Sequence, residues 1–289
     1  MEYESPLYRP PSEANSLILQ ITIGCSHNKC SFCSMYKGKK FRIKSLDEIK
    51  NDIKIARKTY SNVKRIFLAD GNALVLKTKL LKEILLEINT TFPECERIGI
   101  YTAPKDILLK SITELKELKK LGIKIAYLGA ESGNNEVLKN IKKGVSSNEI
   151  RKAGKRIVSS GIKLSVTLIS GLGGKSNWKQ HATDSAKLIN DINPDYLALL
   201  TLLINNETEL YKKIENNEFN LLSPKEVLLE TKLLISNLTL DNCIFRSNHP
   251  SNYVPLAGTL SKDKNLLLDT IDKALKQNYD YKNEYLRKL

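Results

Sequence analysis

The chain has 289 residues, of which 41% are hydrophobic and 27% are charged. This balance excludes a disordered chain and, because no apolar run approaches the ~20 residues of a membrane helix, a multi-span membrane protein. The formal net charge is +14, but nine arginines leave 37 of the 46 basic residues as lysines, which is more typical of a solvated surface than of a nucleic-acid interface.

The N-terminus and the cysteines indicate the compartment. The first residues, MEYESPLYRPPSE, are polar and acidic and do not resemble a signal peptide. Three of the five cysteines fall within nine residues, a spacing unlike the disulfide framework of a small secreted protein. We therefore expect a cytoplasmic protein.

Strand-like and helix-like segments alternate along the chain. Short apolar runs predict strands at Leu17–Ile23, Arg65–Ala69, Ile98–Thr102, Lys124–Gly129, Leu164–Ile169, Tyr196–Leu203 and Asn242–Arg246. Apolar residues in helical phase, with capping residues before several of them, predict helices at Ser45–Tyr60, Lys79–Ile88, Ser111–Leu121, Asn135–Lys143, Ser147–Ser160, Asn177–Ile192, Pro224–Leu238 and Lys262–Gln277.

This alternation predicts an α/β fold with six or seven parallel strands. The strands are continuous apolar runs, as expected where helices cover both faces of a parallel sheet. Because seven strands fall short of a closed eight-stranded barrel, we expect a partial (β/α)6 barrel resembling a TIM barrel, with an open doubly wound sheet as the alternative. We place the core at residues 1–203 and a C-terminal extension, packed on the same domain, at residues 204–289.

The unusual loops follow the predicted strands. Parallel β/α folds bind their ligands at the C-terminal ends of the strands, so these loops should gather the chemistry at one rim. They are Gly24–Arg42, Asp70–Ala73, Thr102–Lys105, Ala130–Asn134, Ser170–Asn177 and Ser247–Tyr253.

The first of these loops carries Cys25, Cys30 and Cys33 in a C-x4-C-x2-C spacing within a polar segment, which indicates a metal centre rather than buried small residues. One interpretation is a zinc site completed by His27. A second is a [2Fe–2S] site, whose fourth cysteine would have to be the distant Cys95 or Cys243. A third is a [4Fe–4S] cluster with three protein ligands and one open iron.

These residues resemble the cluster loop of the radical S-adenosylmethionine (radical SAM) superfamily. The usual family pattern is C-x3-C-x2-C with an aromatic residue before the last cysteine; Phe32 fills that place, and the first gap here is one residue longer. The resemblance covers about Leu17 to Leu203. It is similar to the branch of oxygen-independent coproporphyrinogen dehydrogenases and methylthiotransferases.

The resemblance implies residues that bind SAM after the second and third strands. After the second strand, Asp70 and the Gly71 backbone stand where the family has a Gly-Gly-Glu-like motif that contacts the methionine amino group. After the third strand, Tyr101 occupies a position that often faces SAM.

The resemblance continues after the fourth and fifth strands. Glu131 and Ser132 belong to a G-x-E-S stretch, which implies a polar role for Glu131 near the methionine or ribose. Lys143 stands where relatives pair a basic residue with the SAM carboxylate, although a cation at the end of a helix is an equal alternative. Thr167 and the glycine loop at Gly171 resemble the segment beside the ribose and adenine.

Family membership would imply a [4Fe–4S] cluster and SAM as cofactors. An external one-electron donor, flavodoxin or ferredoxin, would reduce the cluster, and reductive cleavage of SAM would yield a 5′-deoxyadenosyl radical that abstracts a substrate hydrogen under anaerobic conditions. We therefore expect an oxidoreductase or transferase-type enzyme with an unknown substrate, small or macromolecular. The alternative is a zinc-stabilised, basic RNA-binding protein that uses the cysteine loop structurally.

Substrate groups are expected on the later loops. Arg246, Asn248 and His249 lie in a polar segment after the last predicted strand, where they could bind an anion or move a proton, although a hydrogen-bonded turn explains them as well. The basic residues after the cysteines could face an anionic substrate or an acidic electron donor, or could be solvated; they are Lys37, Lys39, Lys40 and Arg42. Single, distant Cys95 and Cys243 argue against an auxiliary cluster.

Overall fold

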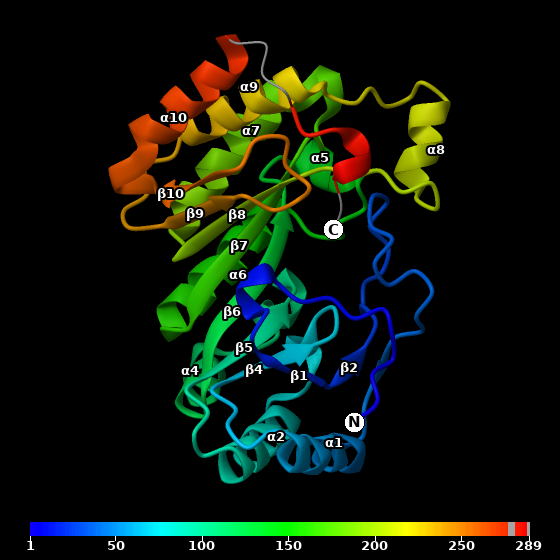
Figure 1. Cartoon of the computed structure of the whole chain (residues 1–289), viewed down its shortest axis with the longest axis vertical. Helices are drawn as coiled ribbons and strands as arrows, with labels where there is room; N and C mark the ends of the chain where they lie inside the picture. Colours follow the sequence, from blue (N-terminus) through cyan, green and yellow to red (C-terminus); the bar gives the residue numbers. More distant parts are fainter. Residues whose placement is uncertain (277–280, 288–289) are drawn as a thin grey trace. The chain divides into compact units, whose positions relative to one another are not determined.

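The computed structural model describes residues 1–276 and 281–287 and has an α/β fold (Figure 1). The strand order of its eight-stranded sheet is β1-β4-β5-β6-β7-β8-β9-β10, and β2 pairs with β3 in a separate two-stranded sheet. This confirms the prediction of a partial barrel of mainly parallel strands. Within the described residues, no helix combines the length and apolarity needed to cross a membrane.

The elements follow one another as β/α repeats. The strands are β1 (Leu17–Gln20), β2 (Thr22–Ile23), β3 (Arg42–Ile43), β4 (Arg65–Ala69), β5 (Arg97–Thr102), β6 (Ile123–Glu131), β7 (Lys163–Ser170), β8 (Tyr196–Thr201), β9 (Ile244–Ser247) and β10 (Leu256–Thr259). The helices are α1 (Leu46–Thr59), α2 (Thr78–Thr91), α3 (Pro104–Leu108), α4 (Ile112–Lys120), α5 (Asn135–Asn140), α6 (Ser147–Ser160), α7 (Gly174–Ile192), α8 (Glu209–Glu215), α9 (Pro224–Ser236) and α10 (Leu260–Lys276).

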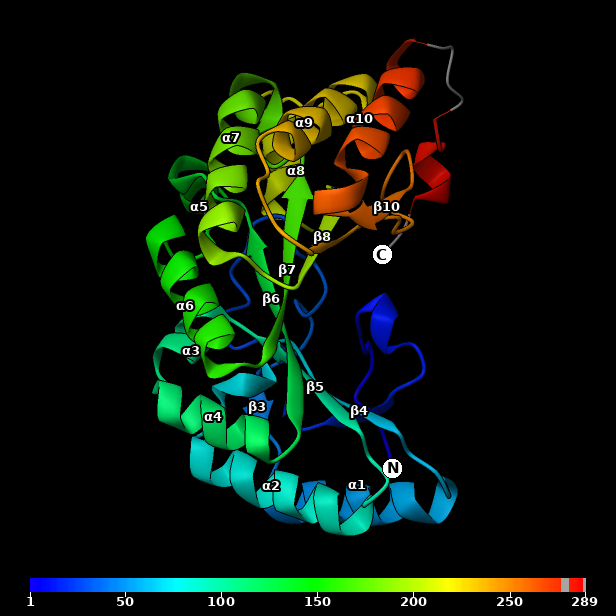
Figure 2. The same ribbon diagram turned by 90° about the vertical axis from the view of Figure 1, so that its left-hand side faces the viewer.

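The chain forms two compact units, and the first comprises residues 1–28, 35–128 and 156–164. Here β1 pairs with β4 and β4 with β5, all in parallel. The strands are buried almost throughout because helices cover the sheet. Helices α1, α2 and α4 lie side by side (Figure 2). Ser45 and Glu48 form the predicted capping box at the start of α1.

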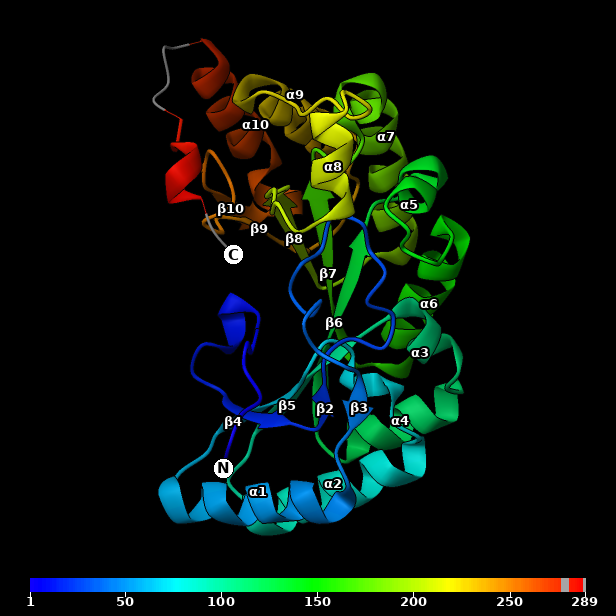
Figure 3. The same cartoon turned by 90° about the vertical axis from the view of Figure 1, so that its right-hand side faces the viewer.

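The second unit comprises residues 29–34, 129–155 and 165–289. Strands β7, β8 and β9 pair in parallel, and β10 adds an antiparallel edge. Helix α9 packs against α7 and α10 (Figure 3). Within the described part of residues 204–289, strands β9 and β10 and helices α8, α9 and α10 belong to this unit. The division expected at residue 203 stays a prediction.

Several predicted boundaries were wrong. The predicted strand Leu17–Ile23 is interrupted at Ile21, where the chain turns from β1 into β2. Helix α5 ends at Asn140, since Lys142 adopts a left-handed backbone with φ of 55°. Helix α7 begins at Gly174, so the glycine loop before it is shorter than predicted.

Other elements were not predicted at all. They are the short helices α3 and α8 and the strands β3 and β10, each of which is too brief for hydrophobic periodicity to emerge. Helix α10 ends at Lys276 as described, and the predicted last residue of that helix, Gln277, lies outside the described residues.

Candidate functional site

The cysteine loop, residues 24–41, is the connection between β2 and β3, whose antiparallel pairing closes its base. Cys25 belongs to the first unit, and Cys30 and Cys33 belong to the second. All three cysteines are half-buried, and cysteine thiolates are the usual ligands of iron–sulfur clusters. In the described parts of the chain, no group of three or more His, Cys, Asp or Glu side chains is placed to hold a metal ion.

In the first unit, Cys25 is packed against a glycine. A Cβ atom on Gly71 would lie 2.9 Å from both Cα and Cβ of Cys25 and from the carbonyl oxygen of Gly24. The neighbouring Asn72 accepts a hydrogen bond from the Ser26 N–H, at 3.0 Å, and donates to the Ser26 hydroxyl, at 2.7 Å. The loop after β4 therefore presses directly on the start of the cysteine loop, and only glycine permits that approach.

In the second unit, backbone hydrogen bonds anchor the segment with the other two cysteines. The Ser31 N–H donates to the Ile141 carbonyl, and the Leu210 N–H donates to the Ser31 carbonyl, both at 2.9 Å. Ser31 is buried, and the adjacent Phe32 is half-buried. The first turn of helix α8, which was not predicted from the sequence, is thus hydrogen-bonded to the segment that carries Cys30 and Cys33.

Asp70 is fully buried at the end of β4, and one of its oxygens holds a hydrogen-bond network. Asp70 Oδ2 accepts from Gln20 Nε2 at 2.9 Å, from the Gly24 N–H at 3.1 Å and from Lys39 Nζ at 2.9 Å. The Asp70 N–H donates to the Thr22 hydroxyl at 3.0 Å. Lys39 is therefore a buried partner of Asp70 rather than a solvated loop lysine.

Two tyrosines, Tyr36 and Tyr101, lie close to Asp70. Tyr101 was a candidate from the sequence, and Tyr36 was not. Tyr36 is buried, and its own burial, followed by the negative charge of Asp70, raises its pKa far above the usual range. Burial also raises the pKa of Tyr101, whose ring packs edge-on against Phe67 with 4.8 Å between centroids. The expected contact of Tyr101 with SAM stays a prediction, and Tyr36 carried no recognised sequence signal.

After β6, Glu131 and Lys143 form an ion pair. Lys143 Nζ lies 3.0 Å from Glu131 Oε1, and both side chains are only 13% exposed. The chain reaches this geometry because the Lys143 N–H bonds back to the Leu138 carbonyl after the end of α5. The alternative of a solvated lysine at the end of a helix is therefore wrong.

The same loop is strained and tied to α7. Glu131 has a left-handed backbone with φ of 67°, which is uncommon for a residue with a long side chain. Ser132 is fully buried, and its hydroxyl accepts a hydrogen bond from the Asn134 N–H at 3.0 Å. The Gly133 N–H donates to the Ser185 hydroxyl at 2.9 Å. Ser132 therefore shapes the turn that holds Glu131.

After β7, the glycine loop is fixed by a glutamate from α9. The Gly171 N–H donates to Glu230 Oε2 at 2.7 Å, and the Ser170 hydroxyl donates to the same oxygen. The other oxygen of Glu230 lies 2.8 Å from His181 Nδ1. Thr167 lies half-buried in β7 opposite Ala198 of β8. Glu230 was not predicted, because it lies 59 positions from the glycine that it bonds.

The three residues predicted to contact substrate lie in or after β9. Arg246 is exposed within the strand and bonds the Phe245 carbonyl, at 2.9 Å. Asn248 is exposed. His249 Nδ1 accepts from the Ser251 N–H at 3.1 Å, and burial together with Lys282 lowers the pKa of His249. His249 thus takes part in a hydrogen-bonded turn, the other explanation that the sequence offered.

The remaining candidates from the sequence are two single cysteines and three basic residues near the cysteine loop. Burial raises the pKa of both remaining cysteines, to about 12 for Cys243. Of the basic residues after the cysteine loop, Arg42 pairs with Glu4 and Glu48 on the surface. Lys37 and Lys40 are exposed.

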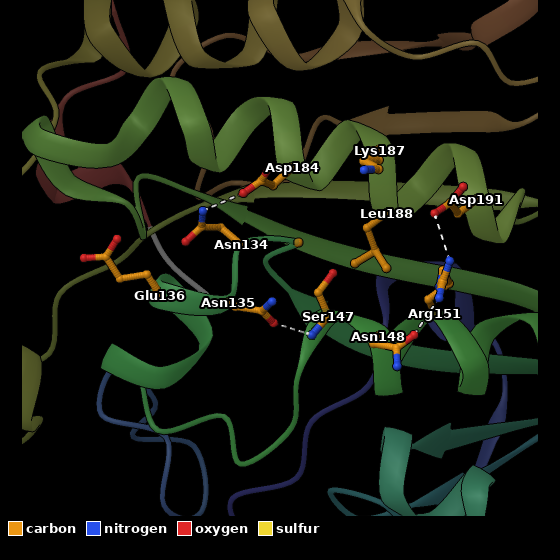
Figure 4. Close-up of a pocket in the computed structure, with 11 residues that line it drawn as sticks. Asn134, Asn135, Glu136, Ser147, Asn148, Arg151, Asp184, Lys187, Leu188 and Asp191 are labelled. Carbon is orange, nitrogen blue, oxygen red and sulfur yellow. Dashed lines mark hydrogen bonds and ion pairs between the residues drawn. The ribbon is translucent and has the colours of Figure 1, made fainter.

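A separate polar pocket of about 380 Å³ lies within the second unit (Figure 4). Its side chains come from the end of the loop after β6 and from α5, α6 and α7, and many bond one another: Asn134 with Asp184 at 2.6 Å, and Arg151 with Asn148 at 2.6 Å. The lining contains none of the residues predicted to bind metal, cofactor or substrate. The pocket shares Gly133 and Asn134 with the loop after β6 but includes no residue of the loops that directly follow β4 and β7.

Comparison with known proteins identifies the family. Residues 19–184 match the family model of the Radical SAM superfamily. Over 144 residues the chain is 31% identical to the tRNA uridine(34) acetyltransferase of Methanocaldococcus infernus, a match that covers 50% of this chain and 26% of that protein. The chain thus spans about a quarter of the length of that relative.

Two solved structures share the fold. A radical SAM methyltransferase, TsrM from Kitasatospora setae, superposes with a TM-score of 0.57 at 15% identity, covering 70% of this chain and 39% of the other. Methylornithine synthase (PylB) gives a TM-score of 0.53 at 14% identity, covering 93% of this chain and 83% of the other. At these identities the likeness concerns the fold, which in PylB extends over almost the whole chain.

Proposed function

The chain belongs to the radical SAM superfamily, and we propose that Cys25, Cys30 and Cys33 are the ligands of its cluster. The protein is an enzyme whose cofactors are a [4Fe–4S] cluster and SAM. When bound, these cofactors supply a 5′-deoxyadenosyl radical for hydrogen abstraction. The substrate and the overall reaction are not fixed by family membership.

The observation that carries this proposal is the construction of the cysteine loop. Three half-buried cysteines lie on one loop that is closed at its base by β2 and β3. Gly71 presses against Cys25, so the strand-end loop that would receive SAM adjoins the first ligand. Three ligands suit a cluster that keeps one iron open for a small molecule.

We propose that residues in three strand-end loops bind SAM. Asp70 would accept a hydrogen bond from the methionine ammonium, and Tyr101 would form part of the wall beside it. The Glu131–Lys143 pair would face the methionine or ribose as a paired charge, and Gly171 with Thr167 would line the adenosine. In this arrangement the side chains bind and orient the cofactor and exclude water and oxygen, and none acts as a nucleophile.

The test is anaerobic purification followed by iron and sulfide analysis and electron paramagnetic resonance of the dithionite-reduced protein. We expect four irons per chain and a [4Fe–4S]+ signal that changes on addition of SAM. Cys25→Ala should abolish the signal, while Cys95→Ala, a matched half-buried thiol outside the loop, should retain it. A colourless protein that holds one zinc would overturn the proposal and support the RNA-binding alternative.

A tRNA is the second candidate for substrate, beside a small molecule. The observation that favours it is the 31% identity, over 144 residues, to a tRNA uridine(34) acetyltransferase. Formation of 5′-deoxyadenosine from SAM should then rise when total tRNA is added to the reduced holoenzyme. An unchanged rate with intact tRNA would leave the small-molecule substrate as the proposal.

A further inference from the structure

The side chain of Asn72 holds the backbone beside the first cysteine of the loop. Asn72 Oδ1 accepts a hydrogen bond from the Ser26 N–H at 3.0 Å, and Nδ2 donates to the Ser26 hydroxyl at 2.7 Å. Asn72 itself is buried. Because Ser26 directly follows Cys25 in the chain, these bonds fix the peptide group that joins the two residues.

A buried carboxylate sets the orientation of the Asn72 amide. Asn72 Nδ2 also donates to Asp106 Oδ2, at 2.7 Å, and Asp106 is buried. An ionised carboxylate only accepts hydrogen bonds, whereas an amide NH2 group has two protons to donate. Asp106 and the Ser26 hydroxyl take both protons of Nδ2, so Oδ1 is left to accept the Ser26 N–H. The orientation of Asn72, and with it the Cys25–Ser26 peptide, therefore depends on Asp106.

Helix α3 holds Asp106 in place. Pro104 begins this helix, and Asp106 lies in its first turn. Two residues beyond the end of the helix, the buried Lys110 donates from Nζ to the Leu76 carbonyl at 2.6 Å. Asn72 and Leu76 flank the same short turn after β4. Both ends of this turn are thus bonded to the region of α3, which restricts movement of Asn72 away from the cysteine loop.

Resting on the proposed function, in which Cys25 is a ligand of the cluster, we infer that Asn72 and Asp106 are positioning residues for that ligand. Neither is a ligand itself: Asn72 holds the peptide next to Cys25, and Asp106 holds Asn72. Groups that orient a metal ligand typically contribute about 10- to 100-fold to metal affinity. Neither residue was among the predicted site residues, because the bonds join segments 46 and 34 positions apart.

The test exchanges the two groups in the cluster-loaded protein. Asn72→Asp places two carboxylates side by side and removes both bonds from Nδ2. Under anaerobic conditions a chelator should therefore remove its iron about 10- to 100-fold faster than that of the wild type. In Asn72→Asp/Asp106→Asn, the amide at position 106 can donate to the carboxylate at position 72, which still accepts the Ser26 N–H. Iron release should then slow again by about threefold or more, as expected for coupling within one hydrogen-bond network.

Asn134→Asp is the matched control, because it also places a carboxylate beside an existing one. In the wild type, Asn134 Nδ2 donates to Asp184 Oδ2 at 2.6 Å, at the start of α5 in the second unit. The control should lower the melting temperature of the cofactor-free protein, as Asn72→Asp does, but should release iron at the wild-type rate. A purely structural role of Asn72 would instead make iron release follow the melting temperature in both variants.

A milder variant keeps the test decisive if Asn72→Asp does not fold. Asp106→Asn keeps the size of the side chain, and it should speed iron release about fivefold, the difference between a charged and a neutral hydrogen bond.

Wild-type release rates in Asn72→Asp and Asp106→Asn, or an equal acceleration in Asn134→Asp, would overturn the inference while leaving the cluster proposal intact. The inference would also fail if the double variant released iron as fast as Asn72→Asp. A wild-type protein that takes up no [4Fe–4S] cluster would instead remove the proposed function itself.

Discussion

The loops that follow β4 and β7 each combine a glycine with a buried carboxylate, but the two carboxylates are used differently. Asp70 accepts three hydrogen bonds at a single oxygen, Oδ2, and its charge also faces the buried Tyr36 side chain. Glu230 uses both oxygens, one for Ser170 and Gly171 and the other for His181. We propose that the first carboxylate binds a ligand, whereas the second holds a loop.

The two carboxylates also differ in the part of the chain from which they come. Asp70 belongs to its own strand-end loop, so its position is set locally by β4. Glu230 reaches the β7 loop from α9, within residues 204–289. The C-terminal part of the chain therefore stabilises a loop that the family resemblance assigns to the adenosine of SAM.

The largest expected effect comes from Asp70→Asn. The substitution removes the charge that faces the ligand ammonium, and it leaves Lys39 buried beside a neutral amide. We expect the Kd for SAM to rise by about 10- to 100-fold, the range for hydrogen bonds between charged groups. Anaerobic binding on cluster-loaded protein measures it, and an unchanged Kd would contradict the view that Asp70 receives the ligand.

Replacing Gly71 and Gly171 by alanine, one at a time, should affect the two loops differently. Gly71→Ala puts a methyl group 2.9 Å from Cys25 and should reduce the iron content, besides destabilising the fold by about 1–3 kcal/mol. Gly171→Ala meets its nearest neighbour only at 3.5 Å, but its φ of 92° strains alanine by about 1–2 kcal/mol. Iron analysis and urea unfolding separate the two, and equal iron loss in both variants would contradict the distinction.

Much of this difference between the two loops could not be predicted from the sequence. The cysteine spacing and the strand-end position of Asp70 and Gly71 are local features, and apolar runs located their strands. Glu230 and Tyr36 could not be predicted, because their roles depend on contacts between distant segments or on a hydroxyl whose surroundings only the fold defines. The early end of helix α5 at Asn140 was not predicted either, because Lys142 adopts a left-handed conformation without being a glycine.

A smaller effect is expected from Glu230→Gln. The amide keeps the shape of the side chain, but it exchanges charge-assisted hydrogen bonds from Ser170 and Gly171 for neutral ones. We expect a loss of about 1 kcal/mol in the free energy of unfolding, the difference between the two kinds of hydrogen bond. Urea denaturation tests it.

The binding data for the same variant probe the comparison directly. If Glu230 only holds the loop, Glu230→Gln should change the Kd for SAM by less than about threefold, a difference of well under 1 kcal/mol. The Asp70→Asn variant is the matched control, because it also exchanges a buried carboxylate for its amide. A Glu230→Gln variant that binds SAM as weakly as Asp70→Asn would mean that both carboxylates face the ligand.

The smallest effect concerns His249, whose loop after β9 also closes its own hydrogen bonds. Nδ1 accepts from the Ser251 N–H, and burial together with the charge of Lys282 lowers the pKa of His249 below its usual value. A lowered pKa in the folded state means that the neutral imidazole stabilises the fold above the unfolded pKa of about 6.5. This contribution is lost as the pH falls from about 6.5 towards the folded pKa.

The melting temperature of the wild type should therefore fall more between pH 7.5 and 5.5 than that of His249→Asn, whose side-chain oxygen can still accept the Ser251 hydrogen bond but cannot take up a proton. Calorimetry at the two pH values measures the difference. An equal fall in both proteins would mean that His249 is protonated in the folded state without cost, which is incompatible with an Nδ1 atom that accepts a backbone N–H. The turn would then be open to solvent, and His249 would again be available to a substrate, as the sequence alone allowed.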